Sequence, residues 1–165
     1  MATPIKAAAQ GVISKIAVSK ATKANPLATM LRNIPIDVKM LTIGHDYACP
    51  PVHAGGLRYH GMSPLISYLI HKGYCRSVAY DQKDVFETAK MLAQTEGMIA
   101  APETAHSLKF VTDEALKCKK TGEQKVIAMN YSGHGLLDLS AYEQYLAGKL
   151  VEYEPQKIEV PTFGN

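Results

Sequence analysis

A glycine-bounded turn at residues 130–135 constrains this chain more than any other feature. Its sequence, Asn-Tyr-Ser-Gly-His-Gly, follows four consecutive apolar residues at 126–129. A short apolar run between polar residues is typical of a buried strand in a parallel sheet. Since ligands of open α/β folds bind beyond the carboxyl ends of strands, this turn is a candidate cofactor edge. The alternative is a glycine-rich connection that Ser132 closes by a local hydrogen bond.

Size, charge and cysteine usage narrow the class of protein. A length of 165 residues predicts one domain with a sizeable core, and no stretch is long and apolar enough to cross a bilayer. The formal net charge of +3 is too small to indicate a nucleic-acid partner. Cys49, Cys75 and Cys118 share no CxxC spacing, so we expect free thiols in a reducing, cytoplasmic compartment.

Residues 1–36 are predicted to form a separate basic segment. This part contains lysine and arginine, whereas no acidic residue precedes Asp37. The composition has some character of a targeting peptide, while a basic surface helix or a flexible arm fits equally well. We therefore place the folded domain at residues 37–150 and expect an extended tail at 151–165.

Strand and helix patterns alternate along the predicted domain. Apolar runs predict strands at residues 38–43, 77–80, 98–101 and 126–129. Apolar periodicity with capping signals predicts helices at 64–72, 83–95, 102–119 and 141–150, the last opened by a capping box of Ser140 and Glu143. This alternation predicts an α/β fold with a mostly parallel sheet flanked by helices.

The long loop at residues 44–61 contains three histidines, His45, His53 and His60. A loop of this length inside a compact domain is usually functional or packs on another element. The histidine spacings fit no zinc-ligand template, so we do not predict a metal site. Histidines that bond the loop backbone or line an anion site are the favoured interpretation.

Glu96 lies at the C-terminal end of the predicted helix at 83–95, directly after its last residue and just before Gly97. A helix C-terminus favours cations, so a carboxylate there is unfavourable by about 0.3–1 kcal/mol. It is either a tolerated surface residue or a carboxylate held beside a site. Ser132, His134 and Asp138 do not predict a hydrolase triad, because triad residues converge from distant segments.

Three separated motifs carry a family resemblance. Residues 53–61, 95–106 and 130–135 contain His-Ala-Gly-Gly-Leu-Arg-Tyr-His-Gly, Thr-Glu-Gly-Met-Ile-Ala-Ala-Pro-Glu-Thr-Ala-His and Asn-Tyr-Ser-Gly-His-Gly. In this order and spacing they resemble the C-terminal half of a tryptophan synthase beta chain, in the form of the divergent second class. The match runs from about residue 43 to residue 142. It implies the C-terminal part of a fold type II, pyridoxal 5′-phosphate-dependent enzyme.

The resemblance implies roles for individual residues. Ser132 matches the serine that hydrogen-bonds the pyridine nitrogen of the cofactor, and a hydroxyl there suits an unprotonated ring. Gly133 and Gly135 match glycines that let the backbone close on the ring edge. Glu96 matches a carboxylate near the ring, and Gly56 matches backbone that lines the pocket. Carbonyl groups near Tyr59 and Gly61 match a monovalent-cation site.

Two parts of the family site have no counterpart in the sequence. The family's Schiff-base lysine follows a histidine in the N-terminal half, and the phosphate loop there is a glycine triplet. This sequence has no glycine triplet, and its only His-Lys pair is His71-Lys72, on a predicted helix.

The resemblance therefore implies a partial lyase that joins indole to L-serine or O-phosphoserine. It would need the complementary N-terminal half, or a homo-oligomer, and an alpha-type subunit could also bind. A catalytically inactive binding or regulatory module derived from the family is the alternative, and a free-standing binder of small ligands is a third interpretation.

Overall fold

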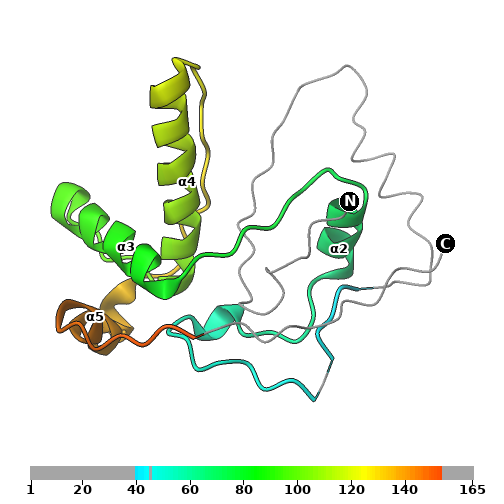
Figure 1. The fold of residues 1–165 in the computed structure, drawn as a ribbon, viewed down its shortest axis with the longest axis horizontal. Helices are drawn as coiled ribbons and strands as arrows, with labels where there is room; N and C mark the ends of the chain where they lie inside the picture. Colours follow the sequence, from blue (N-terminus) through cyan, green and yellow to red (C-terminus); the bar gives the residue numbers. More distant parts are fainter. Residues whose placement is uncertain (1–39, 45, 154–165) are drawn as a thin grey trace.

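The computed structural model describes residues 40–44 and 46–153 (Figure 1). The described residues form the α-helices α2 (Pro64–His71), α3 (Gln82–Glu96), α4 (Pro102–Thr121) and α5 (Leu139–Leu146). Two short 3-10 helices, η2 (Gly55–Leu57) and η3 (Gly135–Leu137), precede α2 and α5.

The core lies where α3, α4 and α5 meet, while α2 lies to one side of them (Figure 1). Phe86 of α3 is its centre: its ring meets the Tyr142 ring edge-on at 5.0 Å and stacks on the Tyr145 ring at 5.8 Å. Small residues of α3 and α4, Ala89 and Ala105, let the helices approach closely. A buried aromatic centre with small neighbours therefore fixes how α5 packs on α3.

The predicted helices are present, with boundaries that their terminal residues explain. Pro64 and Pro102 occupy the first turns of α2 and α4, where a missing backbone N–H costs nothing. Gly97 and Gly122 end α3 and α4 in the left-handed conformation, at φ values of 70° and 72°. The predicted capping box is wrong, because α5 begins at Leu139 and Ser140 already lies inside it.

The predicted parallel sheet is not seen among the described residues. The only β-pairing there is an isolated antiparallel bridge between Thr42 and Gly61. Residues 98–101 and 126–129 have no regular secondary structure. Ladder hydrogen bonds need a neighbouring strand, so a run with strand propensity stays unpaired when no neighbour is present.

The expected burial of residues 126–129 is also wrong for this chain. Val126 is fully exposed and Ala128 is exposed, while Ile127 and Met129 are half-buried. The predicted basic segment at 1–36 lies outside the described residues, as does the tail after residue 153. Within the described part of the chain, no helix is long and apolar enough to span a membrane.

Candidate functional site

The first turn of α4 holds two distant loops together. Pro102, Glu103 and Thr104 form this turn, which follows directly on residues 98–101. Pro102 and Thr104 are buried, and Glu103 is half-buried. Because a proline at the start of a helix fixes the backbone, the next two side chains have defined directions.

Glu103 contacts the loop that contains η2. Its Oε1 accepts a hydrogen bond from the backbone N–H of Gly56 at 2.8 Å. A Cβ added at Gly56 would lie 3.1 Å from that same Oε1 atom, so the glycine permits this close approach. The charged acceptor strengthens the bond and fixes the backbone of the predicted pocket loop.

Thr104 contacts the glycine turn at 130–135. Its hydroxyl donates to the carbonyl oxygen of Ser132, and its Oγ1 lies 3.3 Å from the Ser132 Oγ. Since the Thr104 proton is used on the carbonyl, the Ser132 hydroxyl is the group that can donate in the contact with Thr104 Oγ1. It can donate to a ligand when it rotates away from that oxygen. Ser132 is exposed, so its hydroxyl is accessible to a ligand.

The two glycines of the turn are required by close backbone contacts. Gly133 has φ 68°, and a Cβ there would lie 3.3 Å from the Cβ of Ala101. A Cβ on Gly135 would lie 2.5 Å from the Ala100 carbonyl oxygen. The Gly135 N–H donates to the Ile99 carbonyl at 2.8 Å. The turn therefore lies directly against residues 99–101, an arrangement that only glycine permits.

Glu96 is exposed at the C-terminal end of α3. No hydrogen bond joins it to the Ser132 turn in the part of the chain that the structure describes. Glu103 is a carboxylate that this structure brings to the candidate site, and it was not among the site residues predicted from the sequence. The available signal was its place in a first helical turn, where the helix dipole stabilises a negative charge.

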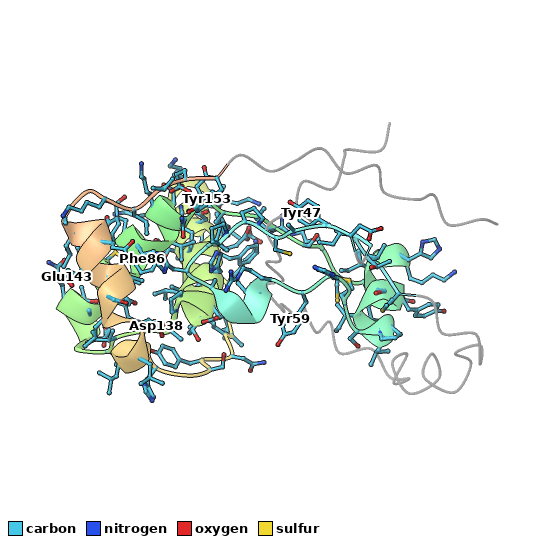
Figure 2. All side chains as sticks on the ribbon, turned by 90° about the horizontal axis from the view of Figure 1, so that it is seen from below. Tyr47, Tyr59, Phe86, Asp138, Glu143 and Tyr153 are labelled. Carbon is cyan, nitrogen blue, oxygen red and sulfur yellow. The ribbon has the colours of Figure 1, made fainter. Side chains whose placement is uncertain are left out.

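Three titratable side chains, those of Glu103, His134 and His53, act on the carboxyl of Asp138. Burial, and next the charge of Glu103, raise the pKa of the Asp138 carboxyl, while His134 and His53 act in the opposite direction. Asp138, labelled in Figure 2, directly precedes α5. His134 has a local role, since its Nδ1 accepts a hydrogen bond from the Leu136 N–H at 3.3 Å. This contact gives His134 a capping role at η3 rather than a place in a triad.

Two histidines of the sequence motifs, His106 and His53, make contacts that stabilise the fold. His106 is buried, its Nδ1 lies 2.7 Å from the Pro102 carbonyl oxygen, and burial lowers its pKa. The ring of His53 meets the Phe86 ring edge-on at 6.5 Å. Within residues 40–44 and 46–153, no three His, Cys, Asp or Glu residues lie close enough to hold a metal ion. His45 lies outside these residues.

The predicted cation site remains a prediction. Tyr59 is exposed on the loop before α2 (Figure 2). The neighbouring carbonyl of His60 accepts bonds from the Ile43 N–H at 2.7 Å and the Thr42 hydroxyl at 2.8 Å. Gly61 forms the bridge with Thr42. These contacts fix the backbone of the loop around Tyr59 and Gly61.

A buried glutamine joins the pocket loop to the C-terminal segment. Gln82, only 5% exposed, accepts a hydrogen bond from the His53 N–H at 3.1 Å and donates to the Val151 carbonyl. The Glu152 carboxylate accepts from the backbone N–H groups of Gln82 at 3.1 Å and Lys83 at 2.6 Å. Glu152 thus caps α3, whereas Asp81, at the N-cap position, makes no capping hydrogen bond with its side chain.

The donor set fits one edge of pyridoxal 5′-phosphate. An exposed hydroxyl at Ser132 and backbone that approaches closely at Gly133 suit a flat heteroaromatic ring with a nitrogen acceptor. Lys72, the lysine of the His-Lys pair in this sequence, has its Nζ 5.7 Å from the centroid of the Tyr68 ring on α2. The described residues around Ser132 therefore fit the ring side of the cofactor.

Curated proteins homologous to this chain are tryptophan synthase beta chains. It is 55% identical over 121 residues to the one from Thermococcus onnurineus, and 58% identical over 118 residues to the one from Thermococcus gammatolerans. These matches cover 73% and 72% of this chain and 27% of each relative. A tryptophan synthase beta chain 2 of Aquifex aeolicus is 57% identical over 115 residues, which cover 70% of this chain and 26% of that protein.

These matches confirm the family resemblance. No protein-family model matches the chain. The chain spans about 27% of the length of the first two relatives, which is consistent with a C-terminal fragment.

Proposed function

We propose that this chain, which is homologous to part of the tryptophan synthase beta chain, supplies the pyridine-ring side of a pyridoxal 5′-phosphate site. One observation carries the proposal: the first turn of α4 holds Gly56 through Glu103 and Ser132 through Thr104. These are two of the residues that the family resemblance assigns to the cofactor. Gly56 lies 47 positions from Glu103 in the sequence, and Ser132 lies 28 positions from Thr104. The fold thus brings both residues to the same end of α4.

Each residue has a distinct task in this proposal. When bound, pyridoxal phosphate supplies an electron sink for breaking bonds of an amino-acid substrate. The Ser132 hydroxyl donates a hydrogen bond to the ring nitrogen and thereby favours the unprotonated ring. Gly133 and Gly135 would let the turn approach the ring edge, and Gly56 would line the pocket. Glu96 stays a candidate from the family resemblance alone.

The activity requires polypeptide that this sequence does not contain. The complementary portion would supply the Schiff-base lysine and the phosphate loop, complete a mostly parallel sheet of the fold type II enzyme, and allow indole to react with L-serine or O-phosphoserine. An alpha-type subunit is a further proposed partner. The three described cysteines are unpaired, which supports a reducing cytoplasmic location.

The test is reconstitution with the complementary portion of a relative. The full chain is coexpressed with the part of the Thermococcus onnurineus beta chain that it does not match, and cofactor absorbance and tryptophan formation are measured. Ser132→Ala should lower cofactor affinity by about tenfold, the expected loss of one strong hydrogen bond. The matched control is Ser140→Ala, an exposed serine on α5, which should have no effect.

The reconstitution experiment can also contradict the proposal. A purified complex that binds no pyridoxal phosphate and forms no tryptophan would contradict the proposal. It would support the inactive binding or regulatory module instead.

A further inference from the structure

The segment after α4 is extended and has no β-partner among the residues that the structure describes. From Thr104 to Thr121 the helix rises about 26 Å, at 1.5 Å per residue. Because Ser132 contacts Thr104, residues 122–132 must return over this distance. A fully extended segment of this length spans about 33 Å, so the return leaves little room for turns. Figure 1 shows this segment descending from the end of α4.

Burial along this segment alternates with the period of a strand. Val126, Ala128 and Asn130 are exposed, whereas Ile127 and Met129 are half-buried. Alternation with a period of two is the property of an extended chain with one covered face. Since Val126 and Ala128 are apolar as well, the uncovered face has the composition of a surface buried in a complete sheet.

The described residues provide only the beginning of such a sheet. The Gly135 N–H bonds the Ile99 carbonyl, which places the end of this segment beside residues 99–101. Met98, at the start of that neighbouring run, is 45% exposed. Two apolar runs therefore lie together at one end, with no β-ladder along residues 126–129 in the described chain.

We infer that residues 126–130 are a docking edge for a β-strand of the complementary polypeptide. The inference rests on the proposed function and adds the place where the two parts join. An unpaired strand offers a row of backbone donors and acceptors, and an added strand satisfies them while it covers apolar side chains. This chain spans 27% of its relatives, so the other part of such a protein is long enough to contain the strand.

Amide hydrogen exchange in the coexpressed complex tests the inference. Exchange at residues 126–130 should slow by at least about tenfold in the complex relative to the isolated chain, while exchange within α3 changes little. A complex in which residues 126–130 exchange as fast as in the isolated chain would overturn the inference. Protection that appears without the complement and grows with chain concentration would also overturn it, because the occupant would then be a second copy.

Proline substitutions test the pairing itself. Ile127→Pro and Ala128→Pro each remove one backbone donor, and adjacent donors point to opposite edges of a strand. At least one of them should weaken association with the complement by about tenfold or more. Gln124→Pro, outside the docking edge, is the matched control and should associate normally. Equal association of all three variants would contradict strand pairing, with circular dichroism reporting that α3, α4 and α5 remain folded.

The outcomes for the edge and for the proposed function are separable. Protection of residues 126–130 without cofactor binding supports the docking edge and contradicts the function. Cofactor binding and tryptophan formation without such protection support the function and overturn the docking edge.

Discussion

The backbone N–H of Gly56 and the carboxylate of Glu103 are joined by a 2.8 Å hydrogen bond, although they lie 47 positions apart in the sequence. This bond holds the loop of η2 against the first turn of α4. The same turn holds Ser132 through Thr104, so the two loops share one support. Substitutions of Glu103 should therefore disturb the loop more than they disturb the helical core.

Glu103→Ala removes the acceptor of the Gly56 N–H. We expect the free energy of unfolding to fall by about 1 kcal/mol, because one partly exposed hydrogen bond is lost. Glu103→Gln keeps an oxygen acceptor and should recover most of that loss. Urea unfolding measures both variants, with Glu87→Ala on the exposed surface of α3 as the control. Equal stability of the alanine and wild-type chains would show that the bond contributes nothing.

Gly135→Ala should be strongly destabilising. The new Cβ would lie 2.5 Å from the Ala100 carbonyl oxygen and 2.7 Å from the Ile99 Cγ2, and the backbone atom has little freedom to move. Overpacking of this kind costs about 1–3 kcal/mol. Thermal unfolding should show a larger loss than for Gly148→Ala, a glycine at φ 67° with open space around it. The reverse order would contradict the close contact.

The stability of the fold should fall at alkaline pH. Burial raises the pKa of Tyr142 from 10.0 to about 12, and its hydroxyl donates to the Ala100 carbonyl at 2.5 Å. Since the folded state keeps this proton where the unfolded chain releases it, the stabilisation is complete below pH 10 and falls between pH 10 and about 12.

Tyr142→Phe tests this assignment. It should lower stability near neutral pH by about 1 kcal/mol and flatten the alkaline decrease. Tyr80, whose pKa burial likewise raises to about 12, should account for part of the decrease that remains. An unchanged profile in urea unfolding at several pH values would show that Tyr142 does not contribute.

Glu152→Gln should weaken the start of α3. The carboxylate accepts bonds from the N–H groups of Gln82 and Lys83, where the helix dipole favours a negative charge. We expect a loss of about 1 kcal/mol that decreases at high salt. Exchange at His53 should increase as well, since Gln82 joins both segments. Glu143→Gln, exposed on α5, is the control, and equal effects of the two changes would argue against capping.

The isolated chain should self-associate. Leu137 is 89% exposed and Leu146 is 69% exposed, and apolar surface of this kind promotes association. Light scattering should show species larger than a monomer, with a population that rises with concentration. A single monomeric species at all concentrations would contradict this expectation.

The helices could be predicted from sequence because their signals are local. Pro64 and Pro102 mark helix starts, and Gly97 and Gly122 mark ends, since each acts through its own backbone geometry. The capping box at Ser140 failed because the same pattern fits inside a helix that begins one residue earlier. The strands could not be verified in the same way, because a strand depends on partners elsewhere in the polypeptide.

The sequence by itself determined the family, the helix ends and the glycine turn with Ser132, because motif spacing and backbone preferences are written in neighbouring residues. Only the tertiary structure decided that Glu103 bonds Gly56, that Thr104 holds the Ser132 turn and that Glu152 caps α3. These contacts join residues 47, 28 and 69 positions apart. The packing of the helices around Phe86 brings these residues into contact, and no local sequence pattern encodes that packing.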